Sequence, residues 1–222
     1  MDSRGLQLVI FDCDGVLVDS ERLSNAIMRD MVEALGYRAS FEDIHQQFVG
    51  LAMPACIARI EALTGAPAPS DFSERFWARM FAAFETELTA VPGIEAVLDA
   101  LTVPYCVASN GRRMKIEFTL GHTGLLSRFA GRIFSVEDVR NPKPAPDLFL
   151  HAARMLGAEA SRTTVVEDTP TGVNAARSAG MRVIGYAAMT PAQRLMQAGA
   201  DAIATTMDEV RQLLTGVQAL KT

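Results

Sequence analysis

Two acidic residues, Asp12 and Asp14, follow the apolar run at residues 6–10 and are the side chains most suited to chemistry. The run predicts a buried strand over residues 6–12, and the period of a strand would point both carboxyl groups to the same side. Two like charges held that close repel each other, so such a pair usually binds a cation or shares a proton. Gly15 then allows a sharp turn. We interpret this segment as a nucleophile site at a strand tip.

Further polar residues with chemical potential follow three later apolar runs of the sequence. They are Ser109, Asn110 and Gly111 after the second run, Lys143 in a proline-flanked loop after the third, and Glu167 and Asp168 after the fourth. Ligands of an open parallel sheet bind outside the carboxyl ends of its strands, so we expect all of these residues to meet at one edge.

The charge balance at this edge predicts a metal ion. Asp12, Asp14, Glu167 and Asp168 place up to four negative charges together. A hard divalent cation with oxygen ligands offsets them, and Mg²⁺ is the usual one where phosphates bind. Lys143 offsets a further charge. It is one of three lysines in a chain where arginine is far more frequent, which indicates a need for a compact ammonium group.

Strands and helices alternate along most of the chain. Short apolar runs predict buried strands at 103–108, 132–134, 164–166 and 182–186, with a weaker one at 201–204. Helical patterns fall at 112–120, 145–156, 171–179, 191–198 and 207–219. This alternation predicts an α/β fold, a doubly wound and mostly parallel Rossmann-like sheet.

One long segment, residues 20–89, carries helical patterns only. Ser40 and Asp43 resemble a capping box at the start of one helix. Another helix has an apolar stripe of Phe72, Phe76, Met80 and Phe84, which we interpret as the core of a helix bundle. We therefore expect a core domain of residues 1–19 and 90–222 and an inserted small α-helical domain of residues 20–89.

The composition of the chain restricts which binding partners and which cellular compartment we expect. The chain has 222 residues, a formal net charge of −5 and no run rich in lysine or arginine, which argues against nucleic acid or an anionic membrane as a partner. The three scattered cysteines suit a reducing compartment. With no signal peptide or membrane-spanning run in the sequence, we expect a cytoplasmic protein, either a monomer or a small homo-oligomer.

The four polar segments, in this order, resemble the haloacid dehalogenase (HAD) superfamily of aspartate-nucleophile phosphotransferases. The first segment fits the D-x-D-G-x-x-x-D-S/T pattern of that family, and Ser109, Lys143 and Glu167-Asp168 fit its second, third and fourth motifs. The resemblance covers essentially the whole chain, and the helical insertion lies where the family has a small helical cap. Closest in appearance are the β-phosphoglucomutase-like sugar phosphatases.

The resemblance implies catalytic roles for three residues. Asp12 would attack phosphorus and form a phosphoaspartate, a covalent intermediate that splits one difficult step into two. Asp14 would act as general acid and then as general base. Lys143 would neutralise charge on the nucleophile and the phosphoryl group.

The resemblance also implies the binding residues. Ser109, Asn110 and the backbone amides at Gly111 would hold phosphate oxygens, aided by the N-terminus of the following helix. Mg²⁺ would be bound by Asp12, by the backbone carbonyl of Asp14 and by Asp168, with Glu167 either binding the metal or supporting a ligand.

The most favoured function is hydrolysis of a small phosphorylated metabolite, such as the sugar-acid phosphate 6-phosphogluconate. A phosphohexomutase of the β-phosphoglucomutase type is an alternative, although Ser24 stands where those mutases carry a histidine and residues 50–53 lack their cap-loop arginine. A non-enzymatic phospho-aspartate switch is a second alternative, against which the helical insertion and the paired acids argue.

Substrate specificity is expected to come from the helical insertion. The candidates that would face the substrate are Ser24, Met28, Gly50, Leu51 and Met53. Arg112 could meet a second anionic group, although a solvated arginine at a helix start is the more ordinary interpretation.

Overall fold

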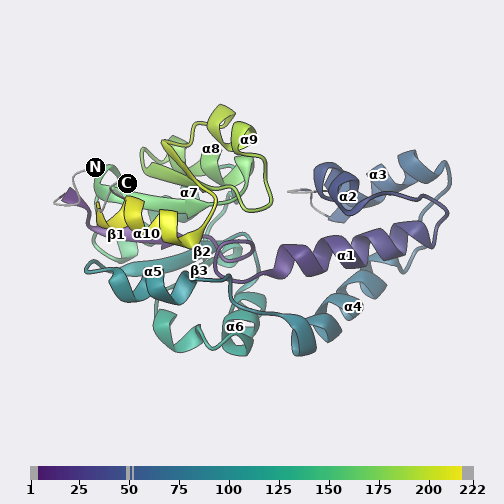
Figure 1. Ribbon diagram of the computed structural model, residues 1–222, viewed down its shortest axis with the longest axis horizontal. Helices are drawn as coiled ribbons and strands as arrows, with labels where there is room; N and C mark the ends of the chain where they lie inside the picture. Colours follow the sequence, from purple (N-terminus) through teal and green to yellow (C-terminus); the bar gives the residue numbers. More distant parts are fainter. Residues whose placement is uncertain (1–4, 49–50, 52, 217–222) are drawn as a thin grey trace, which may run out of the picture. The chain divides into compact units, whose positions relative to one another are not determined.

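The computed structural model describes residues 5–48, 51 and 53–216. The chain divides into two compact units, one made of Met1–Val18 with Thr89–Thr222 and the other of Asp19–Leu88 (Figure 1).

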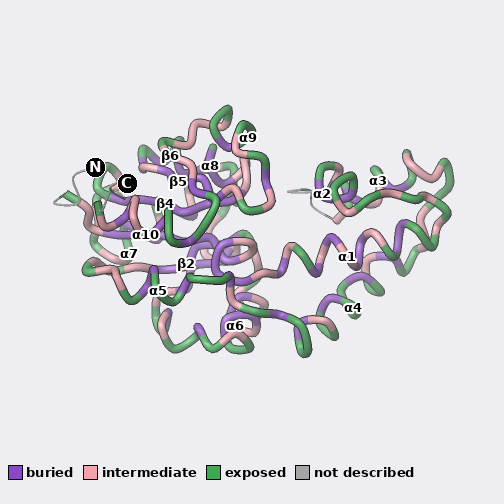
Figure 2. The backbone as a smooth tube through the Cα atoms, in the orientation of Figure 1, coloured by how far each residue is buried: buried purple, intermediate pink, exposed green. Residues whose placement is uncertain are grey.

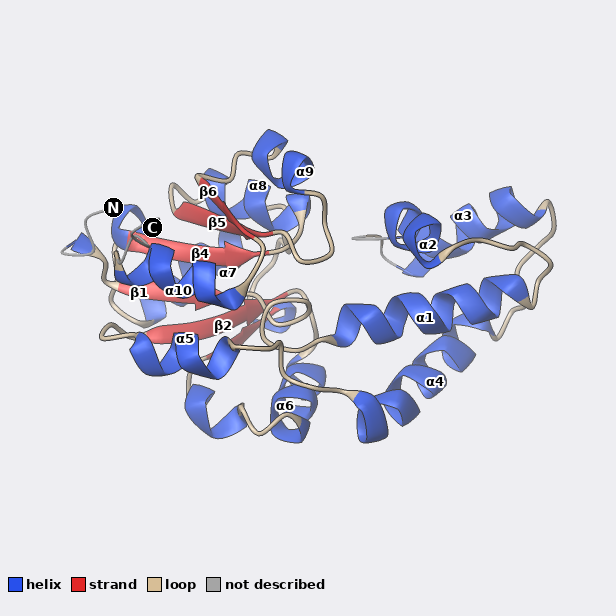
Figure 3. Cartoon of the chain, viewed as in Figure 1, coloured by secondary structure: helices blue, strands red, loops and turns tan. Residues whose placement is uncertain are grey.

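The first unit is built on a six-stranded sheet in which every neighbouring pair is parallel (Figure 3). The strands are β1 (Leu8–Phe11), β2 (Tyr105–Ser109), β3 (Ile133–Ser135), β4 (Thr163–Glu167), β5 (Arg182–Tyr186) and β6 (Ala202–Ala204). Their order is β3-β2-β1-β4-β5-β6. The chain thus winds outward in both directions from the centre, which confirms the predicted doubly wound fold. The direction of winding reverses between β1 and β4, and this reversal marks the switch point of the fold.

Burial explains why the strands are apolar along their whole length. All four residues of β1 are fully buried, and Figure 2 shows the same for most of the sheet. Leu8 and Ile10 belong to a core that also contains Phe149 of helix α7 (Asp147–Met155) and Val173 of helix α8 (Pro170–Ser178). Side chains alternate between the faces of a strand, so the other residues of β1 are buried on the opposite face.

The described residues of the first unit form six α-helices, the last of which follows the final strand. They are α5 (Ile94–Ala100), α6 (Arg113–His122), α7 (Asp147–Met155), α8 (Pro170–Ser178), α9 (Ala192–Gln197) and α10 (Met207–Thr215). Short 3₁₀ helices lie at Leu126–Phe129, Val136–Asp138 and Ala160–Arg162. The sequence patterns predicted α6 to α10 but not α5, whose seven residues span only two turns.

The second unit, Asp19–Leu88, contains α1 (Ser20–Glu33), α2 (Phe41–Phe48), α3 (Met53–Thr64) and α4 (Phe72–Glu87). The apolar stripe of α4 is buried, as expected for a bundle core. The capping box before α2 is also confirmed, because Ser40 N–H donates to the Asp43 carboxylate at 3.1 Å and Asp43 N–H donates to Ser40 Oγ at 3.1 Å. Across the described ranges, no helix has both the length and the apolar character needed to cross a bilayer.

Candidate active site

The carboxyl ends of β1 and β4 bring the first acidic residues together. Asp12 follows β1 directly, and its N–H donates to the carbonyl of Val166 in β4 at 3.0 Å. Glu167 is the last residue of β4. Both carboxyl groups therefore lie at the switch point of the sheet, where ligands of such folds bind.

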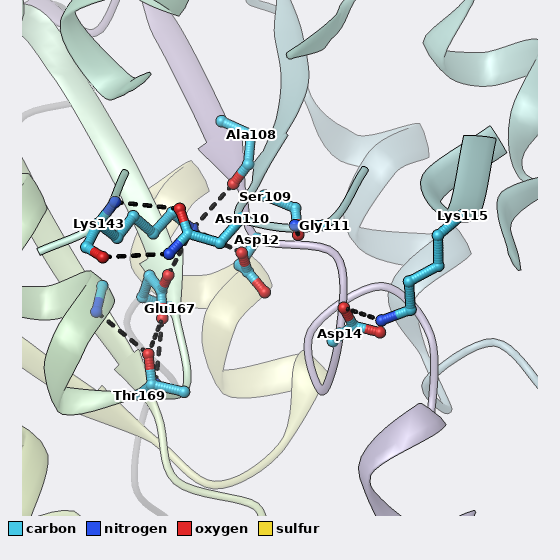
Figure 4. A network of polar contacts seen from close by, with 11 residues as sticks. Asp12, Asp14, Ala108, Ser109, Asn110, Gly111, Lys115, Lys143, Glu167 and Thr169 are labelled. Atoms are coloured by element: carbon cyan, nitrogen blue, oxygen red, sulfur yellow. Dashed lines mark hydrogen bonds and ion pairs between the residues drawn. The ribbon is translucent and has the colours of Figure 1, made fainter. Parts of the chain in front are cut away.

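Lys143 lies between these two carboxylates. Its Nζ donates to Asp12 Oδ1 at 2.5 Å, to Glu167 Oε1 at 2.7 Å and to the carbonyl of Ala108 at 2.9 Å (Figure 4). An ammonium group has three N–H donors, so all of them are used. Burial alone would lower the pKa of Lys143, but the charges of Asp12 and Glu167 outweigh it and raise the pKa. Lys143 is therefore a permanent cation at the centre of the site.

The protonation of Asp12 depends on the charges around it. Burial raises the pKa of Asp12 to about 7; Lys143 opposes this rise, whereas Glu167 and Asp14 add to it. A carboxylate at this position is thus stabilised chiefly by the neighbouring ammonium group. Any further positive charge bound here would favour the ionised, nucleophilic form of Asp12.

Asn110 fixes the loop that carries Lys143. Its side-chain Nδ2 donates to the carbonyl of Lys143 at 3.1 Å, and Lys143 N–H donates to Asn110 Oδ1 at 3.0 Å. The side chain predicted to bind phosphate is therefore engaged with the main chain of another loop. The adjoining turn is closed by Gly111 N–H, which donates to the buried Ser109 Oγ at 3.1 Å. Ser109 and the backbone amides of this turn are left as the phosphate-binding candidates.

Glu167 is held from two sides. Besides the bond from Lys143, its Oε2 accepts hydrogen bonds from Thr169 N–H at 3.1 Å and from Thr169 Oγ1 at 2.9 Å. Thr169 in turn caps α8, because its Oγ1 accepts the N–H of Gly172 at 3.1 Å. Glu167 thus links the ammonium group to the start of a helix. The next residue, Asp168, is buried with 2% of its surface exposed.

The Asp14 side chain has a different hydrogen-bond partner from that of Asp12. β1 ends at Phe11, so Asp14 lies beyond the strand, where it forms an isolated β-bridge with Val18. That both carboxyl groups point to the same side stays a prediction. Asp14 Oδ2 accepts a hydrogen bond from Lys115 Nζ of α6 at 2.7 Å. Figure 4 shows the two acids in separate groups, Asp12 with Lys143 and Asp14 with Lys115.

Sequence reasoning missed Lys115 and Thr169 as parts of this arrangement. The scarcity of lysine was a usable signal for Lys115, because two of the three lysines of the chain contact the paired acids. The signal for Thr169 was a threonine directly before a proline, which is typical of a helix N-cap followed by N1.

The residues of the site fit a divalent cation by charge. Asp12, Asp14, Glu167 and Asp168 bring four negative charges and the two lysines bring two positive ones. Among the described residues, no group of three or more His, Cys, Asp or Glu side chains is arranged to hold a metal by itself. Mg²⁺ commonly uses one or two carboxylates and completes its shell with water and substrate phosphate, which suits this donor set.

The comparisons with known proteins agree with this geometry. Residues 9–186 match the profile of the haloacid dehalogenase-like hydrolases. The chain belongs to this family. HAD phosphatases generally use a divalent metal ion.

Two curated relatives and one solved structure illustrate how similar this HAD hydrolase is to known proteins. It is 31% identical to 6-phosphogluconate phosphatase of Escherichia coli over 184 residues, covering 82% of this chain and 83% of the relative. It is 36% identical to the probable pseudouridine-5'-phosphatase of Drosophila melanogaster over 202 residues, covering 85% and 83%. The crystal structure of a HAD family hydrolase from Deinococcus radiodurans with bound phosphate and sodium superposes with a TM-score of 0.86 at 29% identity, covering 97% of each chain.

The specificity candidates in the helical unit are only partly described. Ser24 and Met53 are partly buried, and Leu51 is exposed, with 41% of its surface accessible. Met28 is buried, with 4% of its surface exposed. Gly50 lies outside the described residues. In the first unit, Arg112 is exposed and is the residue just before α6.

Proposed function

We propose that this HAD hydrolase is a Mg²⁺-dependent phosphatase of a small phosphorylated metabolite and that its reaction passes through a phosphoaspartate on Asp12. The observation that carries the proposal is the buried Asp12 carboxylate at the sheet switch point, paired with Lys143 Nζ at 2.5 Å. A sugar or sugar-acid phosphate is the favoured substrate class, supported by the relative named for 6-phosphogluconate. The bound phosphate in the Deinococcus structure also supports a phosphoryl site.

The first step forms the covalent intermediate. An oxygen of the Asp12 carboxylate attacks phosphorus, and the bond from phosphorus to the ester oxygen breaks with its electron pair on the leaving oxygen. That oxygen takes a proton from the Asp14 carboxyl group, so an alcohol departs. Lys143 keeps Asp12 in place and offsets the charge on the phosphoryl oxygens.

The second step restores the enzyme. Water attacks the phosphorus of the phosphoaspartate while the Asp14 carboxylate takes a proton from it. The bond from phosphorus to Asp12 then breaks, its electron pair returns to the carboxylate, and inorganic phosphate is released. The carboxyl group that donated its proton in the first step is thus reprotonated in the second.

Three groups of this chain would hold the metal ion. Asp12, Asp168 and the backbone carbonyl of Asp14 are the proposed ligands of Mg²⁺, which when bound supplies positive charge against the phosphoryl oxygens. Glu167 is assigned to Lys143 and Thr169 instead, because both of its carboxylate oxygens already accept hydrogen bonds. Phosphate oxygens are assigned to Ser109 Oγ, the amides around Gly111 and the N-terminus of α6.

The test is phosphate release from a panel of phosphorylated metabolites with Mg²⁺ present. The panel includes 6-phosphogluconate, pseudouridine 5'-phosphate and the 1- and 6-phosphates of glucose. We expect steady release from at least one compound, loss of activity in EDTA, recovery on adding Mg²⁺, and no turnover in the Asp12→Asn variant. Interconversion of the glucose phosphates without release would support the mutase instead, and a single burst that stops would support a switch protein.

A further inference from the structure

The ion-pair partner of Asp14 is Lys115 and not Lys143. All three donors of Lys143 are used by Asp12, Glu167 and the Ala108 carbonyl, so this ammonium group has no proton to offer Asp14. The Asp14 carboxylate instead accepts from Lys115 Nζ at 2.7 Å. The nucleophile and the proposed acid-base group are therefore oriented by different lysines, carried by different elements (Figure 4).

The backbone places Lys115 in a defined position beside the phosphate-binding turn. A Cβ atom built on Gly111 would lie 3.4 Å from Ser109 Oγ and 3.7 Å from Lys115 Cδ. The stem of Lys115 thus passes over the turn from Ser109 to Gly111 on its way to Asp14. Its ammonium group connects this turn to the turn that follows β1.

A buried contact fixes the helix that carries Lys115. One turn further along α6, Thr119 Oγ1 lies 3.8 Å from Cys13 Sγ, and both residues are buried. Cys13 directly precedes Asp14, so the same stretch of backbone is contacted twice by α6. The side chains of Lys115 and Asp14 keep 22% and 26% of their surface exposed, so a ligand can reach the pair from solvent.

We propose that Lys115 is a positioning residue that holds the Asp14 carboxyl group where it can pass its proton to the leaving oxygen. This role rests on the proposed function, because it gives the acid-base step of the phosphatase its geometry. Lys115 acts through Asp14. Its effect on phosphorylation of Asp12 is confined to esters whose leaving oxygen, a basic alkoxide or phenolate, needs a proton.

The dependence of rate on the leaving group separates this role from a merely structural one. 4-Nitrophenolate departs without a proton, whereas phenolate gains from one, so loss of the acid-base group slows phenyl phosphate selectively. For Lys115→Met we expect kcat/KM on phenyl phosphate to fall about tenfold, a part of the roughly 10²–10⁴ that a placed acid-base group contributes. The same variant should hydrolyse 4-nitrophenyl phosphate with a nearly unchanged kcat/KM, which reports the step up to phosphorylation of Asp12.

Two variants serve as controls. Lys115→Arg keeps a cation on α6 and should retain most of the activity on phenyl phosphate. Arg113→Met removes the neighbouring cation, whose ion pair goes to Asp138 instead, and should leave the ratio of the two rates unchanged. Thermal unfolding of each variant confirms that it is folded.

The outcomes separate the two proposals. An active wild type in which Lys115→Met slows both esters equally, or neither, overturns the role of Lys115 and leaves the phosphatase intact. A wild type that hydrolyses neither these esters nor the metabolite panel overturns the proposed function, and the role of Lys115 falls with it. A selective loss on phenyl phosphate that Lys115→Arg restores supports the proposal.

Discussion

Replacing Gly172 by alanine tests how tightly Glu167 is held against the start of α8. Gly172 is the third residue of that helix, where alanine is ordinarily favoured over glycine by about 1 kcal/mol. Here a Cβ atom would lie 1.8 Å from both Cδ and Oε1 of Glu167. The extra methyl group therefore occupies space that the carboxylate already fills, and we expect Gly172→Ala to destabilise the protein.

The size of the effect follows from the bonds that must break. Glu167 is 1% exposed and is fixed by Lys143 on one side and Thr169 on the other. If the carboxylate leaves Lys143, the loss is that of a broken buried ion pair, about 3–5 kcal/mol. Alanine in place of glycine stabilises the helix by about 1 kcal/mol, which offsets part of this loss. The net loss in the free energy of unfolding is therefore about 2–4 kcal/mol. Phosphatase activity should fall as well, because Lys143 loses one of its two carboxylate partners.

Urea unfolding measures this loss, and the chain offers a matched control. Gly121 is also inside a helix, and a Cβ there would meet only Leu126 Cδ2 at an ordinary 3.7 Å. Gly121→Ala should therefore be neutral or stabilising. In a Glu167→Ala background the clash is absent, so adding Gly172→Ala should also be neutral or stabilising. A Gly172→Ala protein as stable and as active as wild type would refute the reasoning.

Three further variants probe other parts of the site. Lys143→Met leaves two buried carboxylates facing each other, so we expect a loss of about 3–5 kcal/mol in urea unfolding and no phosphate release; wild-type stability would contradict the ion network. Asn110→Asp keeps the acceptor for the Lys143 N–H but loses the donor to its carbonyl, so unfolding should become easier by about 1–3 kcal/mol and kcat should fall; unchanged kcat would show that the loop needs no such clamp. Burial raises the pKa of Asp138, but hydrogen bonds from Ser135 N–H and the Arg113 guanidinium outweigh it and lower the pKa below 3.8. The stability that Asp138 adds is thus present near neutral pH, and it is lost as the pH falls from the unfolded pKa through the lowered folded pKa. Wild type and Asp138→Asn should therefore differ in urea midpoint above about pH 5 and converge only once the pH is below that lowered pKa; a difference independent of pH would contradict this.

The fold was predictable because its signals are local. β5 was predicted with its observed bounds at Arg182–Tyr186, since a short apolar run between helical patterns is typical of a strand buried on both faces of a parallel sheet. Helix α5 was missed because its two turns lie between a glycine and a strand and show too few periods to recognise. Strand β1 covers Leu8–Phe11 rather than the predicted residues 6–12, because only these residues pair with β2 and β4.

The contacts of the site were less predictable because their partners are far apart in sequence. Asn110 and Lys143 are separated by 33 residues, and Lys115 and Asp14 by 101. Motif order placed the correct residues at one edge of the sheet, but only the register of β1, β2 and β4 decides which donor meets which acceptor. For this reason, Asn110 could be identified as part of the site, but its two hydrogen bonds to the main chain of Lys143 could not be predicted.

The covalent role of Asp12 is tested most directly by trapping the intermediate. The Asp14→Asn variant, incubated with 4-nitrophenyl phosphate and Mg²⁺, should form the phosphoaspartate but hydrolyse it slowly, because no carboxylate activates the water. Quenching in acid, reducing with borohydride and sequencing the peptides by mass spectrometry should then show homoserine at position 12. Homoserine at another acidic residue, or none in an enzyme that releases phosphate, would contradict Asp12 as the nucleophile.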